Sequence, residues 1–159
     1  PEEYILGVQT NLAHAYSDLG RKEEALRMRR DVYSGRLKLS GEEHPETIRE
    51  ATNYAASLVN LQHFKEARAL LRKTMPVARR VLGEGHDLTL MMTLLYANAL
   101  YHDEGATLDD LREAVATLED AAGIARRVLG GAHPLTAAIE ETLRDALSRP
   151  RDAAARGRV

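Results

Sequence analysis

The stretch TNLAHAYSDLGRKEEAL, Thr10–Leu26, contains two helical patterns separated by a glycine. In the first pattern, apolar residues recur from Leu12 to Leu19 at spacings of three and four, which indicates one face of an amphipathic helix. Gly20 can end that helix in the left-handed conformation. A second helical pattern begins near Ala25. The stretch therefore predicts two helices, the first of which ends at Gly20.

A second motif occurs three times at regular intervals. GEEHPETI, Gly41–Ile48, is followed 42 residues later by GEGHDLTL, Gly83–Leu90, and GGAHPLTA, Gly130–Ala137, follows after a further 47 residues. The longer interval falls near HDEGATLDD, His102–Asp110, where we expect a lengthened turn or an extended helix start. A repeat of this length, with two helical patterns in each unit, is typical of stacked helical arrays.

We expect an all-α fold, because Val and Ile are sparse and no stretch alternates apolar and polar residues for long. The expected helices span roughly residues 3–19, 22–40, 45–61, 64–82, 87–102, 107–129 and 134–148. They form a single domain over about residues 1–148, with three repeats at about 3–40, 45–82 and 87–129. The helix at about 134–148 has no partner and is expected to cap the last repeat. Because Pro150 stops a helix, we expect a disordered tail over 149–159.

The histidines of the recurring motif have two possible roles, as metal ligands or as helix N-caps. They are His44, His86 and His133. Metal ligands must lie within about 2–2.2 Å of one ion, whereas helices of successive repeats lie about 10 Å apart. We therefore interpret the histidines as N-caps, followed at the first helical position by Pro45, Asp87 or Pro134. A threonine three residues after each histidine is expected to face the preceding unit; these are Thr47, Thr89 and Thr136.

The composition argues against several functional classes. The chain has 159 residues, a net charge of -2 and no cysteine, so we expect no nucleic-acid partner, no disulfide and no cysteine nucleophile. No apolar run reaches the roughly 20 residues that span a bilayer, and we expect no membrane partner. Adjacent carboxylates such as Glu23 and Glu24 lie among Lys and Arg and read as a solvated face. We expect no enzyme activity, no cofactor, no metal and a cytoplasmic, intracellular location.

The order of residues in Thr10–Leu26 resembles the tetratricopeptide repeat, with Leu-Ala-x-x-Tyr, then Gly, then Glu-Ala. The 42-residue period and the Gly-x-x-His-Pro linker resemble the kinesin light chain type of this repeat. The resemblance covers residues 4–148 and implies a right-handed superhelix of antiparallel helix pairs, with three repeats and a C-terminal capping helix. Arg29 departs from the pattern, since the family usually has a large apolar residue there.

The resemblance implies a non-catalytic module that captures a protein or peptide in a concave groove lined by the first helix of each repeat. Carried over position by position, the groove candidates are Thr10, Asn11, His14, Arg49, Thr52, Asn53, Met91, Leu94, Asn98 and Tyr101. By the same resemblance, an acidic linear motif is a possible ligand. The alternative function is a structural or self-assembling segment of a longer helical-repeat scaffold, with association through exposed terminal helices.

The groove candidates have different expected roles. An Asn amide both donates and accepts hydrogen bonds, so Asn11 and Asn53 can hold an extended peptide backbone or, alternatively, cap neighbouring backbone groups. Arg49 can pair with an acidic residue or a terminal carboxylate of the ligand. An apolar pocket can form where Met91, with its adaptable thioether, lies near Leu94 and Tyr101. The alternative for the last two is simple packing within the superhelix.

Overall fold

The structure, a computed structural model, describes residues 1–156, and side chains are described for residues 1–148. This part contains seven α-helices and no strand. The helices are α1 Glu2–Asp18, α2 Lys22–Ser40, α3 Pro45–Asn60, α4 Phe64–Leu82, α5 Asp87–Tyr101, α6 Leu108–Val128 and α7 Pro134–Arg156. The expected all-α fold is confirmed, and the helices begin and end within one or two residues of the expected bounds except at the end of α7.

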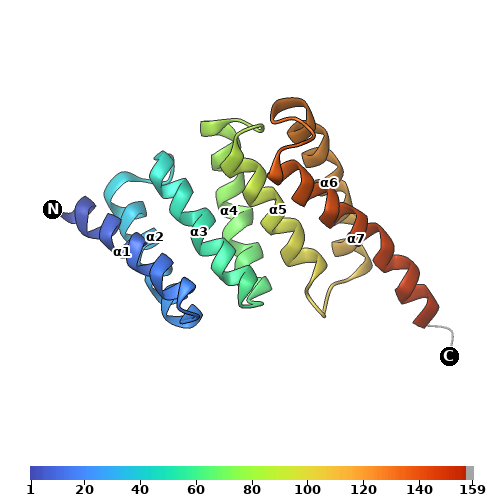
Figure 1. Ribbon diagram of the computed structural model, residues 1–159, viewed down its shortest axis with the longest axis horizontal. Coiled ribbons are helices and arrows are strands. Elements are labelled where there is room, and N and C mark those ends of the chain that lie inside the picture. The colour runs from blue at the N-terminus through green and yellow to red at the C-terminus, as the bar shows by residue number, and fades with distance from the viewer. Residues whose placement is uncertain (157–159) are drawn as a thin grey trace.

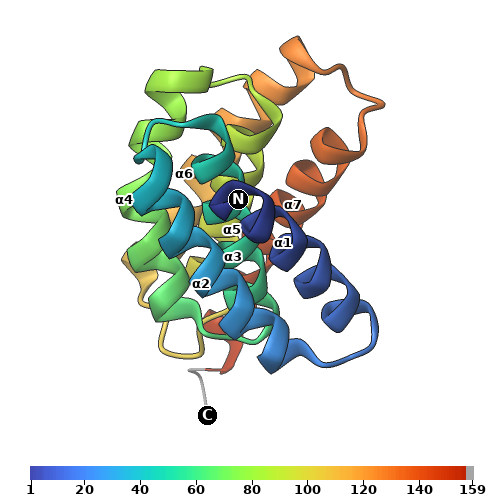
Figure 2. The same ribbon diagram turned by 90° about the vertical axis from the view of Figure 1, so that its left-hand side faces the viewer.

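Successive helices pack against each other and form a row from α1 to α7 (Figure 1). Seen along the row, α2, α4 and α6 form one layer and the odd-numbered helices form the other (Figure 2). The backbone of α5 also contacts that of α3 and α7, whereas no two even-numbered helices approach this closely in the described part. The odd-numbered layer is therefore the tighter side of a helical-repeat solenoid. The central helix α5 is the most deeply buried, with ten buried residues among its fifteen.

The recurring motif forms the joint between one helix pair and the next. The imidazole Nδ1 of each motif histidine accepts the backbone N–H two residues later, at 3.1 or 3.2 Å, so the N-cap interpretation is confirmed. The preceding helix ends at a glycine in the left-handed region, with φ of 81° at Gly41, 92° at Gly83 and 90° at Gly130. The motif threonines are buried as expected, and the Thr47 hydroxyl donates to the Arg36 carbonyl at 3.4 Å.

The extra residues of the third repeat form a longer turn between α5 and α6. Thr107 caps α6 through a reciprocal pair of hydrogen bonds with Asp110, and this accepted N–H lowers the pKa of the Asp110 carboxyl. Arg68 of α4 donates to Asp103 and to Asp110, both at 3.3 Å. The inserted turn is therefore anchored to the preceding helix by two ion pairs that are mostly shielded from solvent.

The end of α7 differs from the expectation. We expected the cap helix to end at about residue 148, but α7 continues to Arg156 and passes through Pro150. A proline removes only one N–H from a helix, and the flanking turns can keep the helix continuous. The helix α4 is likewise unbroken across Pro76. Residues 157–159 of the expected tail lie outside the described residues.

The N-cap role of His86 predicts how the stability of the protein changes when the cap of α5 is removed. Replacement of His86 by Ala leaves the Leu88 N–H without its acceptor and should lower the free energy of unfolding by about 1 kcal/mol. His86→Asn supplies another good N-cap acceptor and should recover most of the loss. Urea unfolding, followed by the circular dichroism signal of helices near about 222 nm, measures the free energy of unfolding of both variants. Equal destabilisation by Ala and Asn would contradict the capping role.

Candidate functional site

A cleft of about 690 Å³ separates α1 from α3 on the odd-numbered layer, with Arg36 of α2 at its side. It exists because the described backbones of α1 and α3 do not come into close contact, whereas those of α3 and α5 do. From α1 the lining includes Tyr4, Gly7, Val8, Thr10, Asn11 and His14. From α3 it includes Glu46, Arg49, Glu50 and Asn53.

Beside this cleft, three positions that hold apolar core residues in the next repeat hold charged residues instead. Arg29, Arg36 and Glu50 are 9%, 6% and 2% exposed. The residues that match them one repeat later are Leu71, Ala78 and Met92, all buried and apolar. Buried charges are costly unless they are paired, so their concentration at the junction of α1, α2 and α3 sets this repeat apart from the next.

Glu50 connects the two walls of the cleft. Its carboxylate accepts the Thr10 hydroxyl of α1 at 2.9 Å and the Asn53 amide of α3 at 3.4 Å. Arg29 donates to the backbone carbonyl of Asn53 at 3.2 Å. Burial lowers the pKa of the Arg29 guanidinium, and the negative charge of Glu50 opposes this shift. Glu50 therefore both fixes the position of α1 against α3 and compensates a buried cation.

Two guanidinium groups at the cleft have weak ion pairs. Arg49 lies 3.4 Å from Glu46, and both side chains are at least 36% exposed. Arg36 is almost fully buried, and its Nη1 lies 3.5 Å from Glu3, which is 72% exposed. The Arg36 Nε is buried without a hydrogen-bond partner. Because the exposed contact of Arg49 contributes little, a carboxylate from a ligand can compete for it, whereas Arg36 is reachable only from the cleft that it lines.

Five of the ten residues predicted for the groove line this one cleft, and they come from both of its walls. They are Thr10, Asn11, His14, Arg49 and Asn53. Asn11 and His14 are exposed. Asn53 is half-buried, and its amide already donates to Glu50, so its carbonyl oxygen is the group left to accept from a ligand.

Two of the predicted groove residues are corrected by the structure. Thr52 is 4% exposed, and its hydroxyl donates to the Ile48 carbonyl at 2.9 Å within the helix. Leu94 is 7% exposed and belongs to the main hydrophobic core. Both face the packed interior, because α3 and α5 are covered by helices on several sides and expose only a narrow strip.

The other three predicted residues lie on α5, outside the lining of the α1–α3 cleft. They are Met91, Asn98 and Tyr101. Asn98 matches His14 across two repeats, not Asn11 and Asn53, so the amides do not form one continuous row. Tyr101 packs against the core and lies edge-on to the His102 ring, with centroids 4.6 Å apart. Half of the predicted set is therefore spread away from the cleft.

Sequence reasoning missed Arg36 and Glu50. A signal was present, because Arg29 and Arg36 are seven residues apart and therefore lie on the same face of α2. Two cations on a face that packs against the next repeat require a nearby anion. Glu50 is the only carboxylate of α3 that is buried, among the residues described.

The described side chains contain no group of three or more His, Asp or Glu residues placed to hold a metal ion. No described helix combines the length and apolar character needed to cross a membrane.

The tetratricopeptide repeat family model matches residues 5–46 and 51–87. The fold also matches a solved structure from Podosopora anserina, described as kinesin light chain nearly identical TPR-like repeats, in a single-substitution variant (TM-score 0.76) and in a second crystal structure (TM-score 0.73). The chain is a tetratricopeptide repeat protein. Both matches share 24% sequence identity and cover 92% of this chain and 67% of the other.

A further structure, BtubC (BKLC) from P. vanneervenii, matches with a TM-score of 0.52 and 17% identity, over 97% of this chain and 66% of the other. This tetratricopeptide repeat chain thus spans about two thirds of the length of the structures that it resembles. At these identities the likeness establishes the fold, which is that of a tetratricopeptide repeat solenoid similar to the one described for the kinesin light chain repeats. A comparison with curated proteins finds no match.

The buried carboxylate yields a stability prediction. Glu50→Ala removes one of the two acceptors of the Thr10 hydroxyl, the other being the Leu6 carbonyl at 3.0 Å, and it removes the charge that opposes Arg29. It should lower the free energy of unfolding by about 2 kcal/mol. Glu43→Ala removes an exposed ion pair with Arg80 and should cost less than about 1 kcal/mol. Urea unfolding of the two variants measures the difference. Similar losses would show that Glu50 does not hold the cleft together.

Proposed function

We propose that this tetratricopeptide repeat protein is a non-catalytic interaction module that binds a linear peptide in the cleft between α1 and α3. The observation that carries the proposal is the cleft itself, which gathers polar side chains from two repeats on the tighter layer of the solenoid. Its volume of about 690 Å³ suits a few residues of an extended chain. Fold alone does not assign a function, so the proposal rests on these residues.

The two guanidiniums among the cleft's lining residues, Arg36 and Arg49, are the groups that would recognise an acidic ligand. A peptide carboxylate that binds Arg49 or Arg36 replaces a long contact to an exposed glutamate with a shorter, charge-assisted hydrogen bond. Asn11 can bind the peptide backbone through both its amide groups, independently of the peptide's side chains. A single cleft of this size gives modest affinity, which tandem sites or avidity can raise. The sequence has no cysteine, which suits a reducing compartment, and we propose an intracellular setting.

A second candidate function is supported by the outer face of α1. Ile5 and Leu12 are 55% and 40% exposed and lie outside the cleft lining, beside Tyr4 and Val8, which are 77% and 48% exposed and also line the cleft. Ile5 matches Thr47 in the next repeat, where the same position is buried against the preceding helix pair. An apolar face of this kind can stack on another repeat or on a second copy of the chain. The candidate is therefore assembly through α1.

Peptide binding is tested with a fluorescein-labelled peptide of alternating Glu and Ala, and with its Gln-for-Glu counterpart. The Glu peptide should bind more tightly in fluorescence anisotropy. Arg49→Glu should weaken its binding about tenfold, the loss of one charge-assisted contact. Arg27→Glu, an equal charge change at an exposed residue of α2 outside the cleft, should leave binding within about twofold. Equal effects of the two variants would contradict a specific site in the cleft.

Assembly through α1 is tested separately by sedimentation equilibrium. If α1 stacks on a second copy, the mass should rise with protein concentration, and Ile5→Glu should abolish the rise by placing a charge in the interface. A monomer at all concentrations would exclude the second-copy form of this candidate and leave the peptide proposal untouched.

A further inference from the structure

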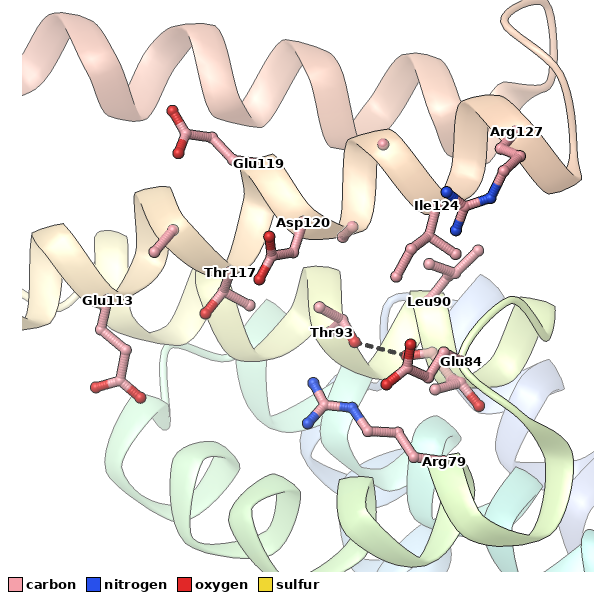
Figure 3. A pocket seen from close by; sticks show the side chains of 14 residues that line it. Arg79, Glu84, Leu90, Thr93, Glu113, Thr117, Glu119, Asp120, Ile124 and Arg127 are labelled. Carbon is pink, nitrogen blue, oxygen red and sulfur yellow. Dashed lines mark hydrogen bonds between the residues drawn. The ribbon is translucent and has the colours of Figure 1, made fainter.

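A second cleft of about 630 Å³ lies on the opposite layer, between α4 and α6, with α5 beneath it (Figure 3). Leu90 and Thr93 of α5 belong to its lining, and both are buried. An adjoining cleft of about 220 Å³ continues between the same two helices, beside Met75 and Tyr96. Together they form an elongated groove, called here the α4–α6 groove, which the proposed peptide cleft does not use.

The preceding repeat contains the matching groove in a filled form. Between α2 and α4 the remaining space is only about 10 Å³. Tyr33 lines that space and lies against Tyr54, with ring centroids 6.1 Å apart. At a spacing of 42 residues, Tyr54 is matched by Tyr96, but Tyr33 is matched by Met75. The α4–α6 groove thus keeps one ring of the pair and lacks the other.

The two clefts of the α4–α6 groove have different linings, with small residues in the larger cleft and the Tyr96 ring in the smaller one. The α6 wall contains Ala116, Ala121 and Gly123, and a Cβ added at Gly123 would meet no atom within 4 Å. In the smaller cleft, the Tyr96 hydroxyl donates to Glu113 at 2.6 Å and accepts from Arg72 at 3.0 Å. These two hydrogen bonds hold the Tyr96 ring in one orientation, so the remaining partner of the ring pair is already in place.

The charges of the groove are also changed from those of the preceding repeat. Lys73 lines the filled groove, and the residue that matches it on α6 is Asp120. Figure 3 shows Asp120 on the side of α6 that faces α5, and Arg79 extending from α4 below. The carboxylates that line the larger cleft are Glu84, Glu113, Glu119 and Asp120, and the guanidiniums are Arg79 and Arg127. Among the described residues, no ion pair is formed by Glu84, Glu119, Asp120, Arg79 or Arg127.

We propose that the α4–α6 groove binds a linear peptide that carries one aromatic side chain flanked by Lys or Arg. The aromatic ring takes the place beside Met75 and Tyr96 that Tyr33 takes beside Tyr54 in the preceding repeat. The flanking cations pair with Asp120 and Glu119 of the larger cleft, in a groove that has four carboxylates and three guanidiniums, Arg72 of the smaller cleft included. The site lies on the layer opposite to the α1–α3 cleft and selects the opposite ligand charge.

The test uses a fluorescein-labelled peptide with one Tyr between two pairs of Lys, titrated into the full chain and followed by anisotropy. Two control peptides replace Tyr with Ala, or the Lys residues with Glu. Each replacement should weaken binding at least about tenfold. Amide shifts in two-dimensional NMR should appear at Thr117 and Gly123 of α6 and not at Asn11 or Asn53. Shifts confined to the α1–α3 cleft, or equal binding of the three peptides, would overturn the proposal.

Two variants test the groove directly. Met75→Tyr restores the missing ring from within the chain and should weaken the Tyr peptide about tenfold by occupying its place. Asp120→Lys restores the charge of the filled groove on an exposed side chain, so it tests the proposal even if Met75→Tyr unfolds. It should weaken binding to a similar extent, whereas Asp31→Lys, the same charge change at an exposed residue of α2, should not. Unchanged affinity in Asp120→Lys, or equal weakening by Asp31→Lys, would overturn the proposal.

Discussion

The arrangement of the whole chain depends on the joint between helix pairs. A glycine in the left-handed region ends one helix, and a histidine Nδ1 accepts a free N–H at the start of the next. The three joints share this geometry, and the threonine three residues after each histidine is buried. The differences between repeats must then come from the side chains that fill the spaces between helices.

Both clefts arise from such differences. On the odd-numbered layer, charged residues at positions that are apolar in the next repeat accompany the separation of α1 from α3. Buried charges seldom add stability over apolar residues, but they fix a particular arrangement once they are paired. Glu50 has this role, since it connects Thr10 on one wall with Asn53 on the other. The first repeat thus replaces part of its apolar core with a polar junction that also forms the side of a cleft.

The sequence predicts the helices and the joints well because both depend on local chemistry. The spacing of apolar residues locates each helix, and the histidine cap requires only the neighbouring backbone. Individual groove residues are harder to predict, because repeat periodicity places a residue on a helix face and not at a depth. Thr52 and Leu94 match Thr10 in register, yet only Thr10 lines the cleft, since α3 and α5 are covered by the helices on either side. The burial of Arg36 and Glu50 likewise depends on contacts between α1, α2 and α3 that no local pattern contains.

A repeat protein allows each repeat to be compared with its neighbour in the same chain, which shares its environment and its joints. The structures from other organisms share 24% identity or less with this chain and establish the fold, but they do not distinguish one groove from another. The comparison between repeats of this chain does distinguish the grooves.

Where the preceding repeat has Tyr33, this repeat has Met75. The base of the groove is kept, but the side chain that fills it in the preceding repeat is missing. Lys73 is matched by Asp120, so the open groove differs from the filled one in charge as well as in volume. The proposed peptide uses both differences, because its ring takes the place that Tyr33 fills in the preceding repeat and its cations pair with Asp120.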